Sequence, residues 1–112
     1  MHKITWNDFK KIEIRVGTII EVENFPETIR PAYKLKADLG NHLGIKKSSA
    51  QITDLYSKNE LIGKQVIVVV NLEEKKIGPF ISECLITGFY KENKSVILAT
   101  VNQKIKNGSL LS

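Results

Sequence analysis

The chain has 112 residues, of which 42% are hydrophobic, so it is long enough for one globular domain with one core and too short for two. Its 17 lysine and arginine residues outnumber 12 acidic ones and give a net charge of +5, which makes polyanions the leading class of partner. The longest apolar run, residues 66–70, is far too short to span a bilayer, and the N-terminus has no signal-peptide pattern. We therefore expect a cytoplasmic protein without membrane insertion.

Residues 5–8 have the form of a capping box and predict a short helix through about residue 11, with Trp6 and Phe9 on one face. Residues 12–23 then change to a period of two, which is typical of a long half-buried strand. The apolar face of this strand would consist of the even positions, namely Ile12, Ile14, Val16, Thr18, Ile20 and Val22. Gly17 predicts a bulge or bend within it.

A second alternating strand is expected over residues 33–39, after a loop bracketed by two prolines. Residues 40–44 form a turn, and the lysine- and serine-bearing segment 44–53 is the third strand of a meander. A second capping box at residues 57–60 predicts a helical turn that ends at Gly63.

The fourth strand, residues 65–70, is apolar on both faces and should be central in the sheet. A fifth strand is expected at about residues 83–90 and a further one at 96–101. This order is that of an all-β, five-stranded OB-fold barrel, with a short N-terminal helix, a helical turn between strands 3 and 4, and extra C-terminal β structure. We expect residues 1–112 to form this single domain.

The ligand face of an OB-fold barrel is built from strands 2 and 3 and from the loops that join strands 1 to 2 and 4 to 5. Lysines, hydroxyls and amides gather on these elements, a composition suited to phosphate oxygens and exposed bases. The candidate RNA-binding residues are Arg30, Lys34, Lys36, Lys46, Lys47, Ser48, Gln51, Asn71, Lys75, Lys76 and Ser82.

The same groove also suits an extended polypeptide, with Tyr33, Ile77 and Phe80 as apolar contacts and the lysines favouring acidic segments. Tyr33 or Phe80 could instead stack on a base. Tyr33 also fits the core, because it begins the alternating apolar series of the second strand.

Catalysis has little support in the sequence. His2 and His42 lack an evident nucleophile or carboxylate partner, and no histidine, cysteine and aspartate have the spacing of metal ligands. Cys84, the single cysteine, precedes an apolar run and is expected to be a buried small hydrophobe rather than a reactive thiol. We expect a protein that is not an enzyme and needs neither cofactor nor metal.

Four ordered segments resemble successive motifs of the tRNA-binding domain family: residues 11–19, 61–66, 69–72 and 82–83. That domain occurs appended to methionyl- and phenylalanyl-tRNA synthetases, in cytokine-like synthetase partners and as free-standing dimers. The resemblance implies a non-catalytic homodimer that binds tRNA or other structured RNA.

Residues 31–35, 48–56 and 77–83 are most similar to the small free-standing members of the family, which are described as export-related chaperones. This similarity implies, as the alternative, binding of unfolded or precursor polypeptides in the same groove. The chain departs from the wider family at Cys84 and Leu85, where a Gly-Met pair is usual, and at Ser49, where glycine is usual.

Apolar residues gather near both ends of the chain, and a small barrel need not absorb them all. They are Ile4, Trp6, Phe9, Leu110 and Leu111. They are expected to form a dimer interface; the alternative is that they plug the open ends of one barrel.

Overall fold

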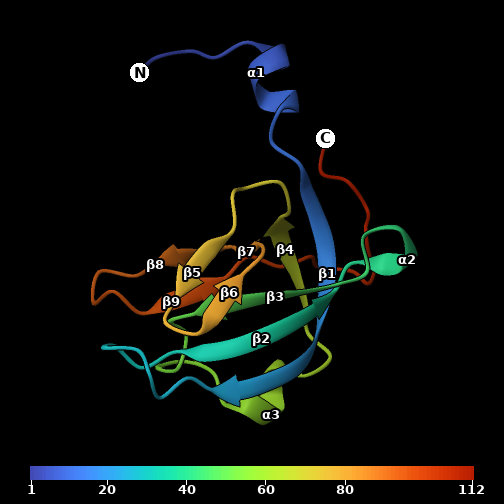
Figure 1. Ribbon diagram of the computed structural model, residues 1–112. Coiled ribbons are helices and arrows are strands. Elements are labelled where there is room, and N and C mark those ends of the chain that lie inside the picture. The colour runs from blue at the N-terminus through green and yellow to red at the C-terminus, as the bar shows by residue number, and fades with distance from the viewer.

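Strand β1 (Ile14–Asn24) is the longest strand and lies in the middle of a five-stranded antiparallel sheet in the order β3-β2-β1-β4-β7. Figure 1 shows this computed structural model, which describes all residues from Met1 to Ser112. The other four strands of the sheet are β2 (Tyr33–Asp38), β3 (Ile45–Ala50), β4 (Gln65–Val69) and β7 (Leu85–Ile86). The predicted meander and the interior position of β4 are confirmed.

The sheet curls into a nearly closed barrel because Glu83 joins its two ends. The amide of Glu83 donates to the carbonyl of Lys47 at 2.8 Å, and the Glu83 carboxylate accepts from the Lys47 amide at 2.9 Å. These two bonds connect the segment just before β7 to the free edge of β3. The structure is thus the all-β barrel of OB type that the strand order predicts.

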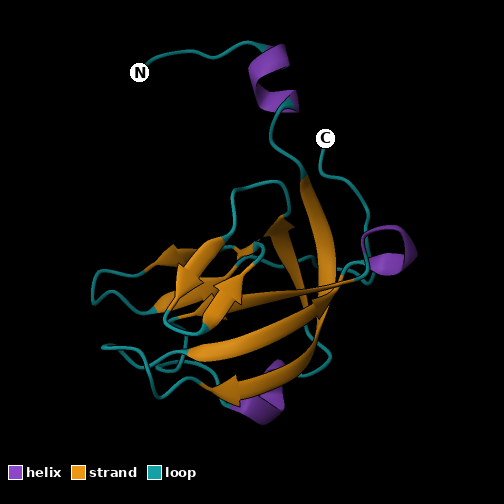
Figure 2. Cartoon of the chain, in the orientation of Figure 1, coloured by secondary structure: helices purple, strands orange, loops and turns teal.

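Three short helices lie outside the barrel, as Figure 2 shows: α1 (Trp6–Lys10), α2 (Gly40–Leu43) and α3 (Lys58–Leu61). Both predicted capping boxes are present, at Thr5 with Asp8 and at Ser57 with Glu60. The segment expected to be a plain turn between the second and third strands is the helical turn α2. No helix of the structure has the length and apolar character needed to cross a membrane.

Two hairpins complete the fold, and both differ from the sequence-based expectation. Residues expected to form only a loop contain the hairpin of β5 (Lys75–Ile77) and β6 (Phe80–Ser82). The expected fifth strand is broken at Thr87, whose hydroxyl and amide both donate to the Ile67 carbonyl. The chain then leaves the barrel as β8 (Gly88–Tyr90) and pairs with β9 (Val96–Leu98), which is shorter than expected.

A β-bulge lies in β1 at Ile20, not at Gly17 as the sequence suggested. Ile19 pairs with Ala37 and Glu21 with Lys36, so Ile20 has no partner on β2. The bulge reverses the alternation of β1, because Ile19 before it is fully buried in the core and Val22, three positions later, packs against the same core. The prediction of one continuous face of even positions is therefore wrong.

Gly17 serves a different purpose, because β1 passes very close to the end of β2 there. A Cβ atom at this position would lie 2.7 Å from Cδ2 of Leu39, closer than carbon atoms approach. The glycine therefore reflects a close approach of backbone and side chain, which is the second common meaning of glycine in a strand.

The core lies inside the barrel and includes Ile19, Leu35, Leu61, Val66 and Val68. The C-terminal segment pairs with the edge of the first half of β1, through bonds from the Gly108 amide to the Val16 carbonyl and from the Leu111 amide to the Ile14 carbonyl, and Arg15 and Leu110 form an antiparallel bridge.

Cys84 is buried beside the junction of β3 and β7, as the sequence suggested. Burial raises the pKa of its thiol from 9.0 to about 11, and the nearby Glu83 carboxylate adds to the rise. Lys46 and a hydrogen bond with Ser48 oppose the rise without cancelling it.

We expect the native thiol to resist alkylation near pH 8, since the thiolate is the reactive form. The native chain should react with iodoacetamide about 100-fold more slowly than the urea-unfolded chain, because two pH units separate the two pKa values. Mass spectrometry measures both rates at one site, since Cys84 is the only cysteine. Equal rates for folded and unfolded protein would contradict the burial.

Candidate functional site

Three neighbouring strands present two rows of polar side chains on the outer surface of the barrel, which we call the three-strand face. One row runs from Glu21 on β1 through Lys36 on β2 to Lys47 on β3. The next runs from Glu23 through Lys34 to Ser49. Side chains opposite one another in an antiparallel sheet are within contact distance, so each row acts as one electrostatic unit.

The two lysines of β2 are paired with carboxylates of β1. Lys36 Nζ lies 3.1 Å from a carboxylate oxygen of Glu21, and Lys34 Nζ lies 3.7 Å from one of Glu23. Sequence analysis took these lysines as phosphate ligands without considering their partners. A phosphate at either lysine would have to displace the carboxylate of the same row.

An aromatic pair borders the three-strand face. The rings of Phe25, in the loop after β1, and Phe80, on β6, meet edge to face with centroids 5.3 Å apart. Lys34 Nζ lies 5.6 Å from the centre of the Phe25 ring, and Lys47 Nζ lies 5.6 Å from the centre of the Phe80 ring. Contacts of this kind between ammonium groups and aromatic faces are attractive.

Phe25 was missed by the sequence analysis, although one signal pointed to it. It is an aromatic residue next to Pro26, in the loop that an OB fold places at its ligand face. The ring is 3% exposed, so Phe25 supports Phe80, which is half-buried and has more surface available to a ligand.

The β5–β6 hairpin carries the other cations of this region. Lys75 and Lys76 are exposed on β5, where they pair with Ser82 and Ile81 of β6. The side-chain amines of these two lysines, and those of Lys46 and Lys47, form no ion pair with a carboxylate. The unpaired cations therefore lie on β3 and the hairpin rather than on β2.

Three predicted ligand residues do not lie on the three-strand face. Ser48 is fully buried, and Tyr33 is 8% exposed with its hydroxyl donating to the Tyr56 carbonyl at 2.8 Å. Both are core residues, so the ligand roles predicted for them are wrong. Lys46 pairs with the buried Ala37 and lies near Cys84, on the side of β3 opposite to Lys47. Successive strand residues point to opposite faces, so Lys46 and Lys47 cannot contact one phosphate track as a pair.

Asn71 joins the start of β1 to the end of β4. Its Oδ1 accepts from the Glu13 amide at 2.9 Å, and its Nδ2 donates to the Lys11 carbonyl at 2.6 Å. Asn71 therefore has a structural role, while its exposed amide keeps a second N–H and a second lone pair, so the RNA contact predicted for it stays a prediction.

The remaining candidates lie around the edge of the region. Arg30 is exposed in the loop between β1 and β2, and Gln51 is exposed just after β3. Ser82 donates to the Cys84 carbonyl at 3.3 Å, and Ile77 is half-buried opposite Phe80.

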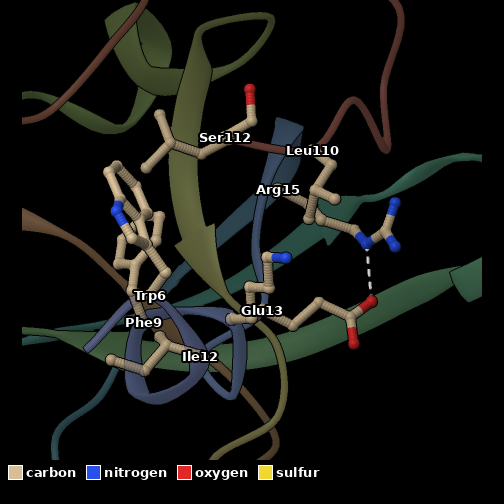
Figure 3. A pocket seen from close by; sticks show the side chains of 9 residues that line it. Trp6, Phe9, Ile12, Glu13, Arg15, Leu110 and Ser112 are labelled. Carbon is tan, nitrogen blue, oxygen red and sulfur yellow. Dashed lines mark hydrogen bonds and ion pairs between the residues drawn. The ribbon is translucent and has the colours of Figure 1, made fainter.

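A second surface feature lies at the end of the barrel where α1 and the C-terminus meet. Figure 3 shows Trp6, Phe9 and Ile12 on one side of a hollow and Leu110 and Ser112 on the other, with the Glu13–Arg15 ion pair at its edge. The hollow has a volume of about 470 Å³. Trp6 is 78% exposed and Leu110 is 55% exposed, so these residues do not plug the barrel.

The barrel topology, with a lysine-bearing polar face bordered by two aromatic rings, defines an OB-fold protein. The family model described as a putative tRNA binding domain matches residues 14–110, and the chain belongs to this family.

Relatives known from sequence are methionine–tRNA ligases, of which this chain matches only a small part. The enzyme of Methanocaldococcus jannaschii is 34% identical over 109 residues, which cover 97% of this chain and 16% of the enzyme. The enzyme of Caldanaerobacter subterraneus is 35% identical over 109 residues, which again cover 97% of this chain and 16% of the enzyme.

Solved structures match over nearly their whole length. A CsaA chaperone protein from Picrophilus torridus is 49% identical with a TM-score of 0.91, covering 98% of this chain and 100% of that one. The chaperone CsaA from Bacillus anthracis is 39% identical with a TM-score of 0.93, covering 99% and 100%. A protein related to methionyl-tRNA synthetase from Pyrococcus horikoshii is 28% identical with a TM-score of 0.87, covering 100% of both chains.

Proposed function

We propose that this protein binds tRNA, or another structured RNA, without catalysing a reaction on it. The observation that carries the proposal is the group of lysines without ion pairs on β3 and the β5–β6 hairpin: Lys47, whose Nζ lies 5.6 Å from the centre of the Phe80 ring, and Lys75, on the same face of the hairpin as Phe80, with Lys76 exposed on the opposite face. Membership of the tRNA-binding domain family supports the same ligand. A tRNA ligand implies a cytoplasmic location.

The binding mode follows from the geometry of these groups. The lysines neutralise phosphates along β3 and the hairpin, and the Phe80 ring offers a surface on which an exposed base can stack. Arg30 and Gln51 lie at the edge, where they can donate hydrogen bonds to the RNA backbone, and Ser82, which donates to the Cys84 carbonyl, can accept one from a ribose hydroxyl. No cofactor is needed for such contacts.

Phosphate contacts of this kind make RNA binding strongly dependent on salt. With about four cations engaged at one site, counting Arg30 with the three lysines, the plot of log affinity against log salt should have a slope of roughly −3 to −4. Lys47→Gln should weaken tRNA binding about three- to tenfold and reduce the steepness of that slope by about one. Fluorescence anisotropy over a salt series measures both quantities.

The matched control is Lys91→Gln, which removes an exposed lysine from the turn after β8 without touching the proposed site. Its affinity should equal that of the wild type. A flat salt response of the wild-type protein would contradict the phosphate contacts.

A second candidate function is binding of an extended polypeptide at the same place. The Phe25–Phe80 pair favours it, because an aromatic ring beside lysines suits segments that combine apolar and acidic residues. The similarity to structures named as CsaA chaperones also favours it. Ile77, which pairs with Phe80, would extend the apolar contact.

Phe80→Ala separates the two ligands. It should weaken binding of an unfolded model peptide by about 1.5–3 kcal/mol, the usual contribution of a buried aromatic ring, and weaken tRNA binding less. Phe89→Ala, on the exposed face of β8, is the control and should leave both affinities unchanged. Unlabelled tRNA should displace the peptide; a peptide that stays bound at saturating tRNA would contradict a shared groove.

We also propose that two copies of the chain associate through the hollow between α1 and the C-terminus. Four large apolar side chains are exposed there, those of Ile4, Trp6, Leu110 and Leu111. A monomeric protein rarely leaves a group of this kind in contact with water. A dimer carries two copies of the three-strand face on one particle, which strengthens binding to a large RNA by raising the effective concentration at the second contact.

Trp6→Ala should convert the dimer to a monomer that keeps the barrel fold, because Trp6 contributes little to the core of its own chain. Analytical ultracentrifugation at several concentrations measures the mass. A wild-type protein that sediments as a monomer at tens of micromolar would contradict the dimer. A Trp6→Ala variant that stays dimeric would place the interface elsewhere.

A further inference from the structure

We infer that Glu21 and Glu23 are specificity-determining residues of the three-strand face, because they compete with RNA phosphates for Lys36 and Lys34. The inference rests on the proposed RNA-binding function and adds to it the course that the RNA backbone takes over the face.

The bulge at Ile20 is the structural cause of this competition. In a regular strand Glu21 would share a face with Ile19, which points into the core. The extra residue turns Glu21 and Glu23 outward, to the side where Lys36 and Lys34 stand opposite them. Both carboxylates thus reach the lysines of the next strand, at 3.1 and 3.7 Å.

Charge is consequently graded across the face. The charges of β1 and β2 cancel within the two pairs, and Asp38, which accepts a bond from the Gly40 amide, adds a further negative charge at the end of β2. On β3 and the β5–β6 hairpin, Lys47, Lys75 and Lys76 remain without carboxylate partners. A polyanion therefore finds lysines without an ion-pair partner along β3 and the hairpin, and lysines already paired with carboxylates on β2.

The pairs are open enough for a ligand to compete with them. The side chains of Glu21 and Lys36 are 45% and 46% exposed, and those of Glu23 and Lys34 are 58% and 30% exposed. Solvent-exposed pairs of this kind are weak, so phosphate can reach the lysines, but only next to a like charge. The glutamates thus lower the affinity for RNA and restrict its phosphates to β3 and the β5–β6 hairpin.

Replacing both carboxylates by their neutral isosteres tests the inference. Glu21→Gln/Glu23→Gln should bind tRNA about three- to tenfold more tightly than the wild type, with a salt slope steeper by about one to two, since two lysines become available to phosphates. In the wild-type background Lys34→Gln/Lys36→Gln should change affinity less than Lys47→Gln. In the glutamine background the same lysine changes should remove the gain.

The control is Glu92→Lys, which raises the net charge by the same two units at one exposed carboxylate that forms no ion pair and lies on the turn between β8 and β9. A gain confined to the Glu21/Glu23 variant supports the inference, and an equal gain in the control overturns it as a general charge effect. The single variants give the same answer if the double variant does not fold. A wild-type protein that binds no tRNA refutes the proposed function itself, whereas tRNA binding that is unchanged in the double variant refutes only the role of the glutamates.

Discussion

The β-bulge at Ile20 is the constraint on which both sides of the barrel depend. Before the bulge Ile19 points into the core, and after it Val22 does, so one strand can pack against the same core along its full length while it bends. The same one-residue shift in the alternation of side chains brings Glu21 and Glu23 to the outer surface. The packing of the core and the charge pattern of the ligand face therefore have one origin.

Several polar residues in family motifs stabilise the barrel. Glu83 bonds twice to the backbone of Lys47 and thereby closes β3 against the segment that leads into β7. The side chain of Asn71 bonds to the backbone of Lys11 and Glu13 and thereby joins the start of β1 to the end of β4. Because these bonds fix the β5–β6 hairpin and Lys47 relative to one another, they position the proposed RNA site without touching the RNA, and their loss would affect binding through geometry.

Much of the fold could be predicted from the sequence, because capping boxes and alternating strands are local patterns. The position of the bulge could not, since Gly17 is the residue type expected at a bulge, and only the register with β2 shows that Ile20 lacks a partner. For the site, the structure brings Lys47 to the Phe80 ring, whereas Lys75, Lys76 and Phe80 lie on a hairpin that was expected to be a loop, and their contacts with RNA stay predictions. Ser48 and Tyr33 were misassigned because side-chain type does not reveal which face of a strand is buried, and Phe25 was missed because its partner is 55 positions later in the chain.

The central claim is that RNA phosphates lie along β3 and the β5–β6 hairpin and avoid the paired lysines of β2. The most direct test is lysine acetylation with and without tRNA, read residue by residue by mass spectrometry. The account predicts strong protection by tRNA at Lys47 and Lys75 and little change at Lys34 and Lys36. Protection that is greatest at Lys34 and Lys36, or at Lys91 and Lys94 on the distant β8–β9 turn, would contradict it.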